Sequence, residues 1–248
     1  MKISLLGTSH GVPEPGRFCS CSLIETGGVS YLIDAGAPVM DLFHRKGVDV
    51  NSLRAVFITH MHGDHTDGLV QLCDLMNWYY QEAQADIYLP DLMGAEYIKG
   101  LVSALEGQPL DENRMRFHLM DENTLYEDEH IRITPFPTKH IELGLRPSFA
   151  YLVEAEGKKV IFSGDLSGGL KGDDFPQYAL DHKIDLMILE MAHFTPEMAH
   201  PWLARCKAER ILLNHVNRWH EKGPGILALN GRFGYPIRMA AEGEEIIL

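Results

Sequence analysis

Cysteine is scarce in this sequence. Four cysteines occur among 248 residues, and they stand at unevenly spaced positions, Cys19, Cys21, Cys73 and Cys206. This pattern argues against a disulfide framework and is typical of a protein that works in a reducing compartment. The pair Cys19 and Cys21 could bind a metal, but a C-x-C without a second pair nearby favours two ordinary small buried residues.

Long hydrophobic runs are also missing. No uninterrupted apolar stretch approaches the length of a membrane-spanning helix, so we expect no membrane partner. The first residues, M-K-I-S-L-L-G-T-S-H-G, reach glycine and polar residues too early for a signal peptide and are better interpreted as a strand. Together with the few cysteines, these features predict a cytoplasmic protein.

Positive charge is in short supply. Lysine and arginine number 22 against 35 aspartates and glutamates, which gives a formal net charge of −13. The mean field of such a surface repels polyanions, so a large nucleic-acid partner is disfavoured. A small phosphate-bearing substrate stays compatible with this balance, because bound metal ions create a positive field of their own.

Repeats, linkers and low-complexity segments are absent as well. A chain of this length with 45% hydrophobic residues can build a substantial core, and we expect a single domain over residues 1–248. Short apolar runs alternate with segments of helical period, which predicts an α/β fold. The predicted strands are 3–6, 22–26, 29–34, 55–59, 86–89, 116–119, 127–138, 149–154, 159–163, 184–189 and 210–213, with a last strand pair within 237–248 around Glu242-Gly243, and the predicted helices are 38–46, 67–80 and 92–105.

An aromatic stretch, M-N-W-Y-Y, ends the predicted helix 67–80. These residues, Met76 to Tyr80, are richer in aromatic rings than a simple helix needs. Packing in the core is the favoured interpretation. The alternative is a pocket wall or the contact surface of a homodimer.

The segment from Arg54 to Gly68 carries the most chemistry. The apolar, β-branched run 55–59 predicts a buried strand. Three histidines and an aspartate follow it at once, namely His60, His62, Asp64 and His65. The first two, spaced by two residues, can point the same way, whereas the other two turn away as the next helix begins. One turn could therefore serve two metal ions. The alternative, a histidine-rich surface loop, explains this cluster at the end of a buried strand less well.

Further ligand types stand at the ends of other predicted strands. They are Asp34, His140, Asp165, Glu190 with His193, and His215. Taken singly, each of these residues could have an ordinary structural role. Asp34, for example, could cap the following helix, or it could accept a hydrogen bond from a metal-bound histidine. However, α/β proteins assemble their sites from loops at one edge of a sheet, so the recurrence at strand ends favours one shared site.

Histidine and carboxylate ligands without thiolates favour zinc, with manganese or iron as alternatives. We expect two divalent metal ions, neither of them fully enclosed by protein ligands. The ligands divide as His60, His62 and His140 for one ion, Asp64, His65 and His215 for the other, and Asp165 as the bridge. Two cations lower the pKa of water towards neutrality and polarise the bond under attack, so hydrolysis is the reaction class that follows. Asp64 would also help to orient the nucleophile.

A family resemblance rests on these residues. T-H-M-H-G-D-H, the later His140, S-G-D at Asp165 and N-H-V-N-R-W at His215 resemble the metallo-β-lactamase superfamily in kind and in order. The resemblance implies a four-layer αβ/βα sandwich with a dinuclear site at one edge of its two sheets. The opening L-L-G-T and the stretch I-L-E-M-A are most similar to the ribonuclease Z and phosphodiesterase branch. In that branch a glutamate and a downstream histidine assist proton transfer, and by position these are Glu190 and His193.

Two departures from the ribonuclease pattern shape the functional prediction. In the ribonuclease an intervening segment separates the glutamate from the histidine, whereas only two residues lie between Glu190 and His193. A helix-cap or core role is therefore the alternative for His193. The ribonuclease also carries a basic arm that grips tRNA before the S-G-D strand, whereas a turn and a hairpin fill the interval from His140 to Asp165. We therefore predict a phosphodiesterase for a small phosphodiester, such as a cyclic nucleotide or a nucleotide derivative, with His193 protonating the leaving alkoxide.

Other functions fit the same residues. An acyl hydrolase of a thioester or lactone is the first alternative, because the same hydroxide attacks a carbonyl carbon. A tRNA 3'-processing endonuclease, a non-catalytic metal-binding module and an iron redox protein are the others. For the favoured substrate, Lys139, Arg146 or Arg218 could steer the phosphate, although each could instead be a surface ion-pair partner.

Overall fold

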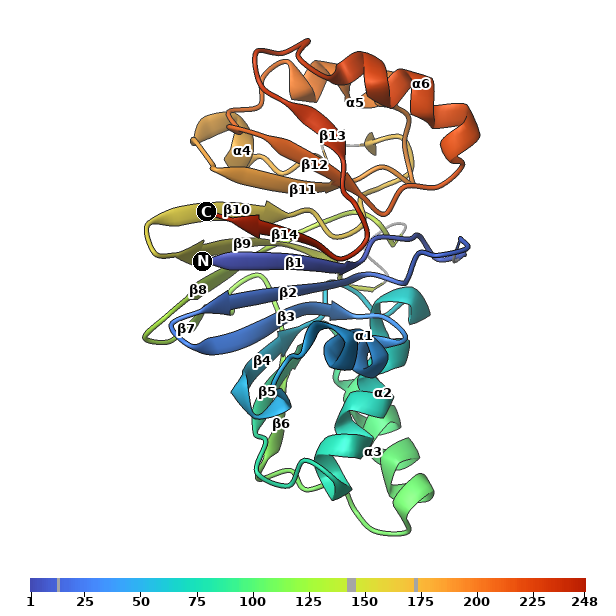
Figure 1. Ribbon diagram of the computed structural model, residues 1–248, viewed down its shortest axis with the longest axis vertical. Coiled ribbons are helices and arrows are strands. Elements are labelled where there is room, and N and C mark those ends of the chain that lie inside the picture. Colours follow the sequence, from blue (N-terminus) through green and yellow to red (C-terminus); the bar gives the residue numbers. More distant parts are fainter. Residues whose placement is uncertain (13, 142–145, 172–173) are drawn as a thin grey trace. The chain divides into compact units, whose positions relative to one another are not determined.

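The computed structural model describes residues 1–12, 14–141, 146–171 and 174–248. The chain forms two compact units, each built around its own seven-stranded sheet (Figure 1). The first unit comprises Met1–Gly7, Gly11–Met120 and Glu242–Ile247, and the second comprises Thr8–His10, Asp121–Ala241 and Leu248. In the described ranges, no helix combines the length and the apolar character that a bilayer span requires.

The sheet of the first unit has the strand order β14-β1-β2-β3-β4-β5-β6. Its strands are β1 (Lys2–Gly7), β2 (Cys21–Thr26), β3 (Val29–Ala35), β4 (Leu53–Phe57), β5 (Ala85–Leu89), β6 (Met115–Leu119) and β14 (Glu244–Ile247). Pairing is antiparallel from β14 to β3 and parallel from β3 to β6. The predicted Gly27-Gly28 turn joins β2 to β3, and both glycines have a positive φ, which a tight hairpin turn requires.

Three helices lie along one face of this sheet, and a short 3-10 helix leads into β4 (Figure 1). They are α1 (Val39–Lys46), η1 (Val50–Ser52), α2 (Gly63–Trp78) and α3 (Leu92–Glu106). Their apolar sides share one core with alternate strand residues such as Leu23, Leu32 and Val56. Helix α2 begins one turn earlier than predicted, so Asp64 and His65 lie in its first turn.

The aromatic stretch Met76–Tyr80 divides between core and surface. Met76 is fully buried, as predicted. Trp78 and Tyr79 are 45% and 63% exposed, however, and the Tyr80 hydroxyl lies 2.7 Å from Nε2 of His44. Core packing therefore accounts for the first part of the stretch, and a homodimer contact stays a prediction for the exposed rings.

The sheet of the second unit has the strand order β13-β12-β11-β10-β9-β8-β7. Its strands are β7 (Tyr126–Glu127), β8 (Arg132–Pro137), β9 (Phe149–Ala155), β10 (Lys158–Phe162), β11 (Leu186–Glu190), β12 (Ile211–Asn214) and β13 (Ile237–Met239). The predicted strand 127–138 is two strands, because the Asp128 carboxylate accepts hydrogen bonds from the backbone nitrogens of His130 and Ile131 and closes a turn. The predicted hairpin β9–β10 is confirmed. The turn predicted after His140 falls on residues 142–145, outside the described residues.

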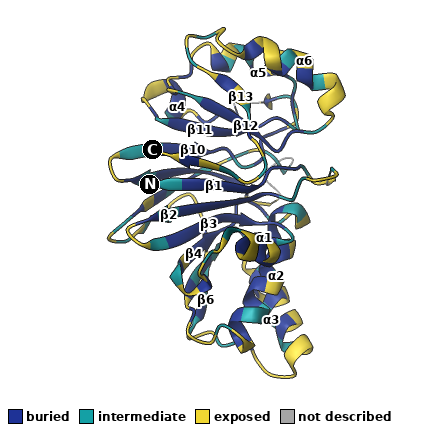
Figure 2. Cartoon of the chain, viewed as in Figure 1, coloured by how far each residue is buried: buried dark blue, intermediate teal, exposed yellow. Residues whose placement is uncertain are grey.

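Three helices that the sequence pattern did not predict complete the second unit. They are α4 (Tyr178–Asp181), α5 (Pro196–Leu203) and α6 (Trp219–Leu229). Their buried sides pack on strand residues such as Ile161, Met187 and Leu213. Figure 2 shows that the strands of each unit are largely buried and that the outer sides of the helices are exposed.

The prediction of a last strand pair within 237–248 is wrong. β13 pairs in parallel with β12 in the second unit, whereas β14 pairs antiparallel with β1 in the first. The intervening turn is fastened to the first unit, because Gly243 N donates to Leu5 O and Phe18 N donates to Glu242 Oε1, each at 2.8 Å. A sequence pattern indicates a strand but does not say which neighbour that strand joins.

The four cysteines are free thiols. Cys21, Cys73 and Cys206 are buried, and Cys19 is partly exposed. Burial raises the pKa of Cys73 to about 12, so this thiol stays protonated. The interpretation of the pair Cys19 and Cys21 as small buried residues is therefore confirmed for Cys21, whereas Cys19 is only partly buried.

Candidate metal centre

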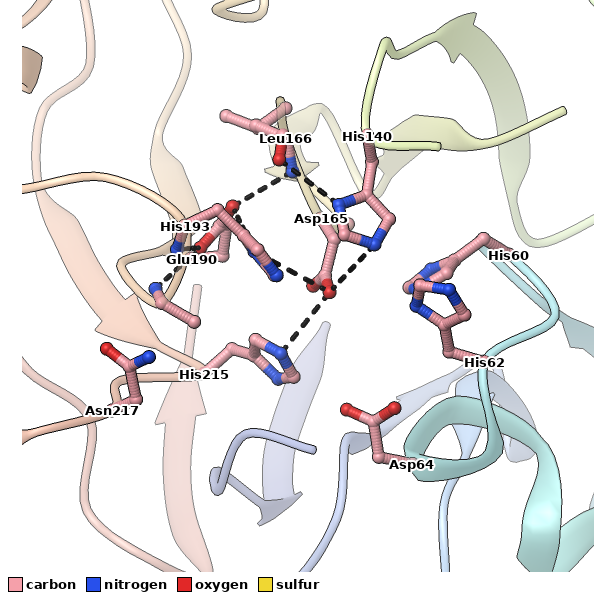
Figure 3. A network of polar contacts seen from close by, with 12 residues as sticks. His60, His62, Asp64, His140, Asp165, Leu166, Glu190, His193, His215 and Asn217 are labelled. Atoms are coloured by element: carbon pink, nitrogen blue, oxygen red, sulfur yellow. Dashed lines mark hydrogen bonds and ion pairs between the residues drawn. The ribbon is translucent and has the colours of Figure 1, made fainter. Parts of the chain in front are cut away.

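The end of β4 and the start of α2 position the histidines of the first unit. Ile58 N donates to Tyr88 O and prolongs the parallel pairing, so the chain leaves the sheet only at Thr59. His60 and His62 then point the same way, as predicted, with Nε2 of His60 at 3.0 Å from Nδ1 of His62 (Figure 3). His60 is fully buried and His62 is exposed.

The start of α2 presents the other two ligand candidates of the first unit. His62 is the N-cap of this helix in extended conformation, and Asp64 and His65 follow in the first turn. The Asp64 Oδ2 atom lies 3.4 Å from Nε2 of His65. A carboxylate in the first turn of a helix also interacts favourably with the helix dipole.

Asp34, at the end of β3, holds this cluster together. Its carboxylate accepts hydrogen bonds from Thr59 N at 2.8 Å and from the Thr59 hydroxyl at 3.0 Å, and lies 2.7 Å from Nδ1 of His65. The cap of α1 is Pro38, so Asp34 does not cap that helix. Of the two roles considered for Asp34, the structure therefore supports the hydrogen bond to a histidine.

In the second unit the predicted residues of four strand ends come together around Asp165. Its Oδ2 atom lies 3.3 Å from Nε2 of His215, 3.6 Å from Nε2 of His140 and 3.8 Å from Nδ1 of His193 (Figure 3). One ligand atom from each of Asp165, His193 and His215 falls within 4.8 Å of the others. Asp165 and His215 are almost fully buried, at 3% and 4% exposed.

Glu190 and His193 also meet, although only two residues separate them. Glu190 is 2% exposed, and its carboxylate accepts hydrogen bonds from the backbone nitrogens of Leu166, Ala192 and His193. Its Oε1 atom lies 3.0 Å from Nδ1 of His193. Three backbone donors fix the carboxylate, and the carboxylate fixes the imidazole, so the short spacing still brings the two groups together.

Two of these residues have an unusual backbone conformation. Asp34 and His215 have φ of 59° and 50°, in the left-handed region that non-glycine residues rarely adopt. Such conformations cost free energy and persist where the surrounding structure holds them, most often at functional sites. His215 is held by a hydrogen bond from its backbone nitrogen to Thr8 O at 3.1 Å.

The histidine tautomers test whether these residues fit a metal. Nδ1 of His65 faces the Asp34 carboxylate, and Nδ1 of His140 lies 3.2 Å from the carbonyl oxygen of Leu166. A carboxylate or carbonyl oxygen accepts a hydrogen bond from the Nδ1–H group, which keeps the proton on Nδ1 and leaves the lone pair of Nε2 for a metal. The tetrahedral edge of a zinc site with such ligands is about 3.3 Å. The distances from Asp64 to His65 and from Asp165 to His215 and His140 match this value, so within each unit the donor sets fit a divalent metal.

The three basic residues considered for phosphate differ in their surroundings. Lys139 and Arg146 are exposed, and the Lys139 backbone nitrogen donates to Asp174. The Arg218 side chain is 71% exposed and lies 3.7 Å from the Glu221 carboxylate. The surface ion-pair interpretation therefore describes Arg218.

Sequence reasoning missed Lys222 and Asn217 of the second unit. The Lys222 ammonium donates to the carbonyl oxygens of Met191 and Ala192 and to Oδ1 of Asn217. Burial lowers the pKa of Lys222. A lysine inside a helix gave no sequence signal, but the asparagine of N-H-V-N-R-W lies next to a predicted ligand and could have been considered.

Comparisons with known proteins agree with this architecture. A ribonuclease Z from Synechococcus sp. (strain CC9311) is 33% identical over 184 residues, which are 72% of this chain and 57% of that relative. The chain thus spans little more than half the length of this curated relative. The metallo-beta-lactamase fold protein YhfI from Bacillus subtilis superimposes with a TM-score of 0.77 at 18% identity, over 99% of this chain and 98% of that chain. The short form of human tRNase Z gives a TM-score of 0.74 at 24% identity, over 100% of this chain and 99% of that chain.

These likenesses confirm the fold that the histidine and aspartate motifs predicted. The family model described as anti-Pycsar protein Apyc1 matches residues 1–205. That range includes the histidine cluster of the first unit together with His140, Asp165, Glu190 and His193 of the second. The chain therefore has the metallo-β-lactamase fold and belongs to the family of the anti-Pycsar protein Apyc1.

Proposed function

We propose that this protein is a metal-dependent hydrolase of small phosphodiesters, such as a cyclic nucleotide or a nucleotide derivative. The observation that carries the proposal is the convergence of imidazole nitrogens from His140, His193 and His215 on one buried carboxylate, Asp165. Buried charge of this kind is stable when it binds metal. We also propose, from the sequence, that the protein is cytoplasmic and that it forms a homodimer.

The proposed cofactors are two divalent ions, with zinc favoured over manganese or iron. The proposed ligands are His60, His62 and His140 for one ion, Asp64, His65 and His215 for the other, and Asp165 for both. The donor geometry within each unit and the motif order of the superfamily support this assignment. Such ions, when bound, supply hydroxide near neutral pH and polarise the phosphorus–oxygen bond.

The chain's own residues supply positioning and proton transfer. Asp34 and the Leu166 carbonyl set the tautomers of His65 and His140. Glu190 holds the ring of His193, and we assign to His193 the proton that the leaving alkoxide needs. Asp64 would orient the attacking oxygen in addition to its role as a ligand.

A small diester is favoured over RNA by two features. The net charge of −13 disfavours a long polyanion. The hairpin β9–β10 occupies much of the interval in which the ribonuclease branch carries its basic arm. Cleavage of RNA is nevertheless the second candidate, and the 33% identity to a protein named ribonuclease Z favours it.

Turnover by metal-loaded protein tests the proposal. Bis(4-nitrophenyl) phosphate and a 3',5'-cyclic nucleotide should be cleaved, whereas a precursor tRNA, a lactone and a thioester should be cleaved at least about tenfold less efficiently. The variant Asp165→Asn should abolish turnover, and Asp181→Asn, which changes an exposed aspartate of the same unit, should not.

Three outcomes would contradict the proposal in different ways. Robust acyl cleavage without diester cleavage would establish the acyl hydrolase instead. Preference for the precursor tRNA would establish the second candidate. Metal binding without any turnover would leave a non-catalytic module.

A further inference from the structure

A recess of about 450 Å³ lies beside His193 in the second unit. Its walls come from the segment 192–198 and from α6, and they include Asn217, Arg218 and Lys222. His193 is common to the recess and to the group around Asp165, because its ring also lies 4.5 Å from that of His140. A phosphodiester whose leaving group meets His193 would therefore have this recess next to it.

The lysine in this wall is fully engaged. Nζ of Lys222 donates to Met191 O at 2.6 Å, to Ala192 O at 2.7 Å and to Asn217 Oδ1 at 2.6 Å. An ammonium group has three protons and no lone pair, so these three acceptors use all of its donors. Lys222 therefore shapes the wall and does not offer a hydrogen bond to a phosphate.

The same contact orients the side chain of Asn217. An ammonium group only donates, so the atom of Asn217 that faces Lys222 must be the oxygen. The amide nitrogen then lies on the other branch of the side chain, with two N–H donors in a residue that lines the recess (Figure 3). Asn217 can thus donate to a ligand while its oxygen stays fixed.

Charge in the recess is balanced. Arg218 and Lys222 are matched by Glu197 and Glu221 among its lining residues. A subsite for a second phosphate would need an excess of positive charge, which this wall does not have. Pro196 and Met198 add apolar surface. The combination of apolar surface with a few oriented polar groups suits a neutral, hydrogen-bonding ring.

We propose that this recess holds the nucleobase of the phosphodiester and that Asn217 donates a hydrogen bond to the base edge. The inference rests on the proposed function and adds to it the place of the base and the residue that contacts it. Asn217 is then a specificity-determining residue. The Lys222 contact pre-orders Asn217, so no side-chain rotation is needed when the base enters.

The variant Asn217→Asp isolates the donor. It keeps an oxygen for Lys222 and replaces the two N–H donors by a second acceptor. Adenosine and inosine 3',5'-cyclic phosphates present opposite donor and acceptor patterns on the same edge of the base. The ratio of their kcat/KM values should therefore change about tenfold or more between the natural protein and Asn217→Asp. A shift towards adenosine would place the carboxylate at the 6-amino group, and a shift towards inosine would place it at N1.

Asn123→Asp is the matched control, because Asn123 is an exposed residue of the same unit outside the recess. It should leave the ratio unchanged. An unchanged ratio in Asn217→Asp, with a melting temperature equal to that of the natural protein, would overturn the inference. Cleavage of bis(4-nitrophenyl) phosphate without cleavage of either cyclic nucleotide would also overturn it and would leave the diesterase proposal intact. Failure to cleave any phosphodiester would instead overturn the proposed function, and the inference with it.

Discussion

Asp34 orients His65 through a buried contact of 2.7 Å between Oδ2 and Nδ1. The two residues are far apart in sequence. Asp34 lies near the end of β3, and His65 lies in the first turn of α2. Thr59 donates to the same carboxylate from its backbone nitrogen and its hydroxyl. The Asp34 carboxylate thus faces the His65 ring in a fixed position, and Nε2 of that ring is turned towards Asp64.

Replacing Asp34 by alanine should weaken metal binding without removing a ligand. His65 would lose the acceptor that fixes its tautomer and ring orientation, and such losses lower metal affinity about 10- to 100-fold. Titration of metal-free protein against a coloured zinc chelator measures the affinity of each site. Asp41→Ala, on the exposed side of α1, is the control. Equal affinities in Asp34→Ala and the natural protein would contradict this role of Asp34.

Replacing Asp64 by alanine should remove one of the two metal ions. Asp64 lies 3.4 Å from Nε2 of His65, and an ion shared by the two would lose one of its two proposed carboxylate ligands. The metal content of the purified protein, measured by elemental analysis, should fall from about two ions per chain to about one. Retention of both ions in Asp64→Ala would show that the ligand assignment is wrong.

Replacing His193 by alanine should affect substrates according to their leaving groups. A diester that releases an alkoxide needs a proton, so its kcat should fall about 100-fold or more. Bis(4-nitrophenyl) phosphate releases a stable phenolate and should lose far less. Glu190→Gln should show the same pattern more weakly, because Glu190 acts by holding His193. An equal loss for both substrates would indicate that His193 has a structural role only.

Asp86 should make the first unit more stable above pH 4 than below it. Partial burial acts to raise the pKa of this carboxyl, but hydrogen bonds from Arg116 and His118 outweigh it, so the pKa lies below the ordinary value of 3.8. A lowered folded-state pKa contributes stability that is complete above the unfolded-state pKa and is lost as the pH falls through the folded-state value. Asp86→Asn should therefore melt about 2 °C lower than the natural protein at neutral pH. The difference should shrink as the pH falls below about 4, and a difference that is constant with pH would contradict this account.

Ligand-type side chains at strand ends were predictable from the sequence, because an apolar run that stops at a histidine or aspartate is a local pattern. Asp165, His140, His193 and His215 were found this way, and their convergence in the second unit follows from neighbouring strands that end at one edge of a sheet. The role of Asp34 could not be decided from sequence. Whether Asp34 caps a helix or holds a histidine depends on whether the turn that carries Thr59 and His65 comes close to it in the folded chain.

Helix α6 shows what the sequence hid. It contains Gly223-Pro224-Gly225, which local rules interpret as a turn. Close packing accounts for the two glycines within the helix, because a Cβ atom at Gly223 would lie 3.1 Å from the Trp219 ring and one at Gly225 would lie 3.0 Å from Pro196. Lys222 sits in the same segment, so its contacts with the 191–192 carbonyls could not be predicted without this helix.

The pairing of β14 with β1 has a consequence for biosynthesis. Nearly the whole described chain separates Leu5 from its partner Glu244. The first sheet therefore leaves the ribosome with the backbone groups of β1 open along one edge, and it stays so until residues 244–247 have been made. An open edge is a template for pairing with other nascent chains, and domains that fold during synthesis are most exposed to this hazard. Chaperone dependence during translation should thus be concentrated in the N-terminal sheet and should end when β14 emerges.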